Sequence, residues 1–197
     1  MTARPGPRSF DPVLVGNREC DAWAAYYRHE WRTFLRAAVG MVRAGFGMNT
    51  RRTMAGAWFV LRANQVWAPY PKNDPARARA FMRRFYTLVV ADGQLQLDPT
   101  EAARREVEWW RVHRIHQREA DLTEADLTDA LVSLYSYVYQ VDGDSVRPAA
   151  YLRVVAMRLS DEWVASGCAL DSELLAEERR ALVASYAALR EGIDRSG

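Results

Sequence analysis

Apolar and aromatic side chains recur at steps of three and four residues along most of this chain. In the first such stretch, which runs from Asn17 to Val39, Trp23, Tyr27 and Trp31 follow this spacing. The period places side chains on one face of an amphipathic α-helix, and Asn17 is a suitable N-cap for it. No segment keeps the two-residue alternation of a half-buried strand long enough to compete with a helix. The pattern therefore predicts an all-α protein.

Start and stop signals divide this pattern into about seven helices. Two Asp-Pro pairs, at 74–75 and 98–99, each place a capping carboxylate before a proline at the first helical position. Thr123 and Asp171 are further N-caps, and Gly192 is expected to stop the last helix. The expected helices span about residues 17–39, 50–66, 75–91, 99–119, 124–138, 145–163 and 174–189.

A single compact domain is the expected organisation. The chain has 197 residues, of which 49% are hydrophobic and 26% charged, as is typical of a folded protein with one core. Residues 1–10 are rich in Pro, Gly and Arg, so we expect a flexible N-terminal tail there. Residues 11–197 then form a single all-helical domain.

The charge pattern argues against nucleic-acid binding. Arg and Lys outnumber Asp and Glu in residues 1–120, whereas the reverse holds in residues 121–197. The positive charges are scattered along helix faces rather than gathered in one run, so we expect no nucleic-acid partner. The opposite signs are consistent with packing of the two parts against each other.

The cysteines and the N-terminus predict a cytoplasmic protein. Cys20 and Cys168 lie far apart and lack CxxC or Cys/His spacing, so we expect two free thiols in a reducing compartment. The N-terminus lacks the apolar core of a signal peptide. No apolar run approaches the length of a membrane span, so we expect none.

The helix expected over residues 99–119 holds the main candidate site. One of its faces combines a carboxylate, an indole and two imidazoles at steps of three or four residues, from Glu106, Trp109, His113 and His116. A histidine there can ligate haem iron, bind another metal or act as a general base. The alternative is that both histidines are hydrogen-bonded residues of a partly buried helix.

A metal site on this helix can take only some of the known forms. Two-metal carboxylate centres in helical bundles use Glu-x-x-His pairs, and neither histidine has a glutamate three positions before it. A mononuclear site stays open, with His113 and His116 as metal ligands beside Glu106. A further ligand would be His29 or Glu30 from another helix.

Two groups of arginines are further candidates. Arg79 and Arg83 carry guanidinium groups that suit a carboxylate, a phosphate or a haem propionate, although a solvated helix face is the alternative. The second group is our choice for acid-base chemistry if no cofactor is bound; it comprises Arg147, Arg153, Arg158, Asp161 and Glu162. No Gly-rich phosphate loop and no Gly-x-Ser-x-Gly elbow is present.

The order of segments between residues 63 and 163 carries a resemblance to a known family. A proline-bearing loop is followed by an Arg-rich helix from Arg77 to Tyr86, and then by an Ala/Arg-rich helix that includes Val112-His113. This layout resembles the haem-dependent oxygenase family that includes the mycophenolic-acid oxygenase MpaB and the latex-clearing rubber oxygenases. That family is all-helical.

The resemblance implies a haem site built around the central helix. His113 or His116 would be the axial ligand of the iron, and Arg79 or Arg83 would face the distal side. The implied function is a haem-dependent oxygenase-like tailoring enzyme, an oxidoreductase of secondary metabolite biosynthesis that acts on an apolar small molecule.

Two other functions stay open, one of them without any cofactor. The first is a cofactor-free tailoring enzyme of secondary metabolism, whose acid-base groups would be Glu106, Glu30, Asp161 or Arg158. The second is a non-enzymatic accessory protein, which would bind a protein partner or a second copy of the chain through an aromatic surface. The candidate catalytic residues are therefore Glu106, Arg79 and Arg83.

Overall fold

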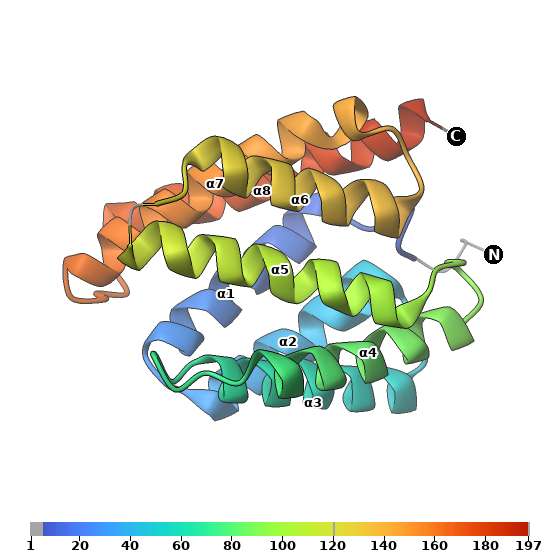
Figure 1. Cartoon of the computed structure of the whole chain (residues 1–197), viewed down its shortest axis with the longest axis horizontal. Helices are drawn as coiled ribbons and strands as arrows, with labels where there is room; N and C mark the ends of the chain where they lie inside the picture. The colour runs from blue at the N-terminus through green and yellow to red at the C-terminus, as the bar shows by residue number, and fades with distance from the viewer. Residues whose placement is uncertain (1–5, 120, 197) are drawn as a thin grey trace.

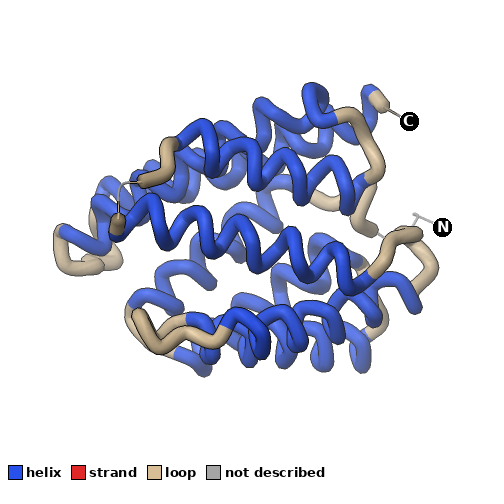
Figure 2. Tube along the Cα trace, viewed as in Figure 1, coloured by secondary structure: helices blue, strands red, loops and turns tan. Residues whose placement is uncertain are grey.

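The computed structural model describes residues 6–119 and 121–196 of the chain (Figure 1). Within these residues it contains eight α-helices and no strand, with loops and turns as the connections (Figure 2). The predicted all-α fold is thereby confirmed. The helices are α1 (Pro12–Tyr27), α2 (Trp31–Phe46), α3 (Thr50–Trp67), α4 (Pro75–Ala91), α5 (Pro99–Arg118), α6 (Glu124–Tyr139), α7 (Gly143–Ala165) and α8 (Glu173–Arg195).

The eight helices close into a ring. Each helix packs against the next one along the chain, and α8 packs back against α1. In Figure 1, α2, α3 and α4 form a lower group and α6, α7 and α8 an upper group, while α5 crosses in front and α1 lies behind. Because every helix contributes one face to the inside of the ring, side chains distant in sequence meet there.

The first amphipathic stretch is two helices, which is why the count exceeds seven. α1 begins at Pro12, and the side chain of Asp11 caps it by accepting two backbone hydrogen bonds. The expected cap at Asn17 is therefore wrong. The stretch breaks at His29, whose backbone φ of 57° lies in the left-handed region. The apolar spacing continues on both sides of His29, so periodicity alone does not reveal this break.

Three of the predicted helix caps are confirmed. Asp74, Asp98 and Thr123 cap α4, α5 and α6 through side-chain hydrogen bonds to backbone N–H groups. The last cap is corrected, because Ser172 rather than its neighbour Asp171 accepts the hydrogen bond that begins α8. Asp171 and Ser172 can both cap a helix, so the sequence leaves the start of α8 uncertain by one position.

Gly192 lies inside α8 rather than at its end. The helix continues to Arg195, so the predicted stop at Gly192 is wrong. A Cβ atom at this position would clash with the backbone oxygen of Ser145 in α7. Glycine is used here because α7 and α8 approach each other closely, not because the helix ends. α7 itself begins at Gly143, two residues before its expected start.

The packed part of the chain includes Phe10. Its side chain is 3% exposed, and its ring packs edge-to-face against Tyr186 with a centroid distance of 5.7 Å. The expected tail over residues 1–10 is corrected at this end, while residues 1–5 lie outside the described residues. The described chain therefore contacts the core before α1 begins.

Two apolar clusters form the core. The main cluster draws buried residues from every helix and surrounds the inside of the ring. The second cluster lies between α1, α7 and α8, and it consists of Cys20, Ala24, Ala156, Trp163, Leu175 and Leu182. Among the described helices, none is both long enough and apolar enough to cross a membrane.

Candidate functional site

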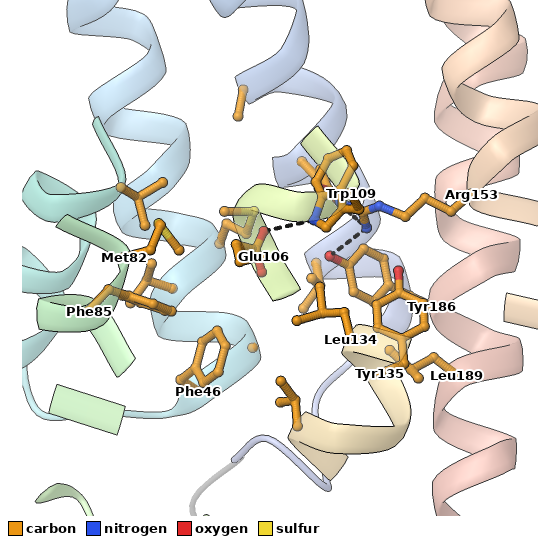
Figure 3. A pocket seen from close by; sticks show the side chains of 18 of the residues that line it. Phe46, Met82, Phe85, Glu106, Trp109, Leu134, Tyr135, Arg153, Tyr186 and Leu189 are labelled. Atoms are coloured by element: carbon orange, nitrogen blue, oxygen red, sulfur yellow. Dashed lines mark hydrogen bonds and ion pairs between the residues drawn. The ribbon is translucent and has the colours of Figure 1, made fainter. Parts of the chain in front are cut away.

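A pocket of about 170 Å³ lies inside the ring, and all eight helices contribute to its wall. In Figure 3, the apolar side chains of Phe46, Met82 and Phe85 stand on one side, with Arg153 and the tyrosines on the other. An engineered apolar cavity of about 150 Å³ holds one benzene molecule. The central pocket therefore has room for a single small ring with a substituent.

Glu106 places a carboxyl group in the wall between these two sides. The Tyr86 hydroxyl donates a hydrogen bond to Oε2 at 2.8 Å, and Nε1 of Trp109 donates to Oε1 at 3.1 Å. Burial raises the pKa of Glu106, although the hydrogen bonds and the charge of Arg153 partly oppose the rise. Glu106 therefore holds its proton to a higher pH than an exposed glutamate does.

Arg153 and Glu19 form a buried ion pair in the same wall. Nη1 of Arg153 donates to Oε2 of Glu19 at 2.9 Å, and Nη2 donates to Oε1. The guanidinium carbon lies 5.3 Å from the ring centroid of Trp109 and 5.4 Å from that of Trp23. Burial acts to lower the pKa of Arg153, but the Glu19 carboxylate outweighs it and holds this pKa well above its usual value. The two side chains carry opposite charges, so the pair has no net charge.

Two polar atoms of the wall make no hydrogen bond of normal geometry with the described residues, although Arg153 lies close enough to the Tyr135 hydroxyl to act on its pKa. They are the Tyr135 hydroxyl and Nε of Arg153, and both residues are 6% exposed. Burial raises the pKa of Tyr135 to about 12, so its hydroxyl keeps a proton that it can donate. Because buried polar groups nearly always have partners, these two donors require an explanation.

A smaller pocket of about 80 Å³ adjoins the central one and contains His113. The two pockets share wall residues, including Trp109 and Trp110 of α5. Nε2 of His113 lies 3.4 Å from Oδ2 of Asp161, and Gln117 donates a hydrogen bond to Oδ1 of the same carboxylate. His113 thus lies against Asp161 of α7 in the smaller pocket.

The sequence-predicted residues separate into three groups. Glu106 lines the central pocket, as a residue on the aromatic stripe of α5 should. His113 lines only the smaller pocket, and the half-buried His116 lines neither. Arg79 and Arg83 are exposed on α4, so the structure does not bring them to the pocket.

This arrangement does not fit the haem site that the resemblance implies. An axial ligand has to face the space that holds the macrocycle, but neither His113 nor His116 lines the central pocket. The expected distal residues, Arg79 and Arg83, lie on the outside. Across residues 6–119 and 121–196, no three His, Cys, Asp or Glu side chains are grouped so that they could hold a metal ion. A metal at His113 and His116 would therefore lack a third such ligand from this part of the chain.

Sequence reasoning missed Glu19 and the role of its partner Arg153. Glu19 follows Val15 at a four-residue step and precedes Trp23 at another, so a carboxylate interrupts an apolar face. Arg153 interrupts the apolar face of α7 in the same way, although it was assigned to a different charged group. A charge within an apolar stripe is the signal that could have identified both.

No protein-family model, curated protein or solved structure matches this chain. The similarity to haem-dependent oxygenases stays a prediction, and the function has to be inferred from the central pocket.

Proposed function

We propose that this protein is an enzyme that binds a small, largely apolar molecule in the central pocket and transfers a proton through Glu106. The observation that carries this proposal is a carboxyl group with a raised pKa in the wall of a pocket that fits one ring. A perturbed carboxyl beside enclosed space is typical of a catalytic acid or base. The acid-base chemistry would come from the chain's own side chains.

The surroundings of Glu106 suit both protonation states. The protonated form is favoured by burial. After proton transfer to the bound molecule, the carboxylate would still accept hydrogen bonds from Tyr86 and Trp109, and Arg153 would attract its negative charge. A carboxyl group whose pKa is raised toward the working pH is a more efficient proton donor and acceptor than an exposed carboxyl group.

Infrared spectroscopy tests the protonation state on which the proposal depends. As the pH is lowered, the C=O stretch of a protonated carboxyl that Glu106→Gln removes should appear at a higher pH than the bands of exposed carboxyls. Glu101→Gln is the matched control on the same helix, because Arg104 and Arg105 lower the pKa of Glu101 to about 2. A Glu106 band that appears only together with the bands of the exposed carboxyls would contradict the proposal.

Proton transfer itself can be followed by NMR in D2O. A panel of one-ring compounds is incubated with the protein, and exchange of carbon-bound hydrogen atoms is measured. We expect wild type and Glu101→Gln to accelerate exchange for at least one compound, and Glu106→Gln to lose the acceleration. Full exchange activity in Glu106→Gln would contradict the proposed role of Glu106.

The haem-dependent alternative makes a separate prediction. Protein purified after expression with haem supply would show a Soret band, which His113→Ala or His116→Ala would remove. Such a band would favour the oxygenase function implied by the resemblance. It would also argue against the proposal that the central pocket binds only a one-ring substrate.

A further inference from the structure

The unpartnered donors in the central pocket identify the chemistry of its ligand. Five buried side-chain atoms lack a hydrogen-bond partner among the described residues, and they belong to Tyr135, Arg153, Ser160 and Glu178. Only Tyr135 and Arg153 of these four line the central pocket. Both are more than nine-tenths buried, so bulk water does not explain how their donors are satisfied.

The missing partner has to be a hydrogen-bond acceptor. The Nε–H of Arg153 can only donate, and its other nitrogens already contact Glu19 and Tyr186. The Tyr135 hydroxyl keeps its proton and can donate as well. Two donors on α6 and α7 that face the same small pocket match one acceptor oxygen, as in the oxyanion holes of enzymes.

The charge of the site favours an uncharged acceptor. The charge of Arg153 is balanced by Glu19, so the wall of the pocket has no surplus positive charge to offer an anion. A carboxylate or phosphate would add an unbalanced negative charge to a buried and mostly apolar site, which is strongly unfavourable. A carbonyl oxygen meets the need of the two donors without this cost.

The walls define the rest of the ligand. Figure 3 shows the polar atoms of Arg153 and the tyrosines at one side of the pocket and the apolar side chains of Phe46 and Phe85 at the other. A molecule that fits has a polar end and an apolar body. The volume of about 170 Å³ limits that body to roughly one ring.

We infer that the central pocket binds an uncharged one-ring carbonyl compound, whose oxygen accepts hydrogen bonds from the Tyr135 hydroxyl and Nε of Arg153. This inference rests on the proposed function, because it supplies the substrate class for the proton transfer by Glu106. Glu106 would then lie in the wall between the carbonyl end and the ring end of the ligand.

Binding of three matched compounds tests the inference. Acetophenone carries the carbonyl, ethylbenzene lacks it, and benzoate replaces it with a charged group. By NMR titration, acetophenone should bind about tenfold more tightly than ethylbenzene, which corresponds to the loss of a hydrogen bond. Benzoate should bind more weakly than either.

Tyr135→Phe removes one of the two donors and keeps the ring. Its affinity for acetophenone should fall toward that for ethylbenzene, while its affinity for ethylbenzene should stay unchanged. Tyr137→Phe is the matched control on α6, because the Tyr137 hydroxyl bonds Asp98 and does not line the central pocket. Equal binding of acetophenone and ethylbenzene, no binding of either, or no effect of Tyr135→Phe would overturn the inference.

Glu106→Gln separates this inference from the proposed function. If both are right, this variant binds acetophenone but no longer accelerates exchange of its methyl hydrogens in D2O. Exchange that persists in Glu106→Gln, together with binding that depends on Tyr135, would overturn the proposed function alone. Carbonyl-independent binding together with Glu106-dependent exchange of another compound would overturn the ligand class alone.

Discussion

The central pocket and the second cluster each bury a glutamate, but the two side chains have different polar surroundings. Glu106 accepts hydrogen bonds from Tyr86 and Trp109 beside the pocket. Glu178, on α8 against the second cluster, is fully buried, and its polar neighbours include Ser160 and Cys20, which lie outside normal hydrogen-bond geometry. Burial raises the pKa of Glu178 to about 8, whereas Ser160, Cys20 and Arg179 act to lower it.

The comparison shows that a raised pKa alone does not identify a functional group. Burial raises the pKa of both glutamates. Glu106 lies beside a pocket with two unpartnered donors, whereas Glu178 does not line the central pocket or the smaller one. A molecule bound in the central pocket would therefore meet the first carboxyl, while the second acts on the stability of the fold.

Removal of the cation beside the pocket should have the largest effect. Arg153→Met leaves Glu19 as a buried charge without its partner, so the free energy of unfolding should fall by about 3–5 kcal/mol. Urea denaturation followed by circular dichroism measures the loss. Arg147→Met should leave the midpoint unchanged, since the Arg147 pair with Asp129 is exposed. A loss as small as that of the control would contradict a desolvated ion pair.

Replacement of the two glutamates by Met should give opposite signs. Glu178→Met removes a buried carboxyl whose contacts with Ser160 and Cys20 fall outside normal hydrogen-bond geometry, and it should stabilise the fold by about 1–3 kcal/mol at neutral pH. Glu106→Met should destabilise it, because Tyr86 and Trp109 lose their acceptor. Denaturation midpoints of the two variants provide the test. Equal signs would show that the two environments do not differ as described.

The pH dependence of stability should report Glu178. The unfolded chain releases this proton near pH 4.5 and the folded chain near pH 8, so the folded state holds the extra proton between these values. The free energy of unfolding should therefore decrease by about 1.4 kcal/mol per pH unit as the pH rises through this window.

Denaturation at several pH values should show that Glu178→Gln makes this dependence shallower. Glu106→Gln should also reduce it, since burial raises that pKa too. Glu101→Gln should not, because its pKa of about 2 places its effect below the window. An unchanged slope in Glu178→Gln would show that Glu178 is ionised in the folded state.

The parts of the fold that depend on neighbours in sequence were predictable. Asp74 and Asp98 each cap a helix through a backbone N–H two or three residues away, so a local pattern suffices. The break at His29 and the place of Gly192 inside α8 depend on contacts between helices. Local spacing contains no information about such contacts, and both predictions failed there.

The candidate site, like the fold, was predictable only where it depends on residues close in sequence. Glu106 was found because it shares a helical face with Trp109. Glu19 and Arg153 are 134 residues apart, and only closure of α8 onto α1 completes the ring in which they meet. Their pairing depends on the complete fold, although the charge of each within an apolar stripe is visible in the sequence.

The smallest effects are expected on the outside of α4. Arg79 and Arg83 are exposed, so Arg79→Ala and Arg83→Ala should each change stability by less than about 0.5 kcal/mol. Acetophenone binding should also stay unchanged in both variants. Met82 and Phe85 of the same helix line the pocket, so Phe85→Ala should weaken binding. NMR titration of the three variants measures this difference.

Comparison of the two faces of α4 tests whether its apolar residues or its arginines line the central pocket. Met82 follows Ala78 by four residues and precedes Phe85 by three, so these residues lie on the inner face, whereas Arg79 and Arg83 are each displaced by one position. One position rotates a side chain by about 100° around a helix. A loss of ligand binding in Arg79→Ala or Arg83→Ala, with Phe85→Ala unaffected, would require α4 to turn its arginines inward, as the distal side of a haem site would demand.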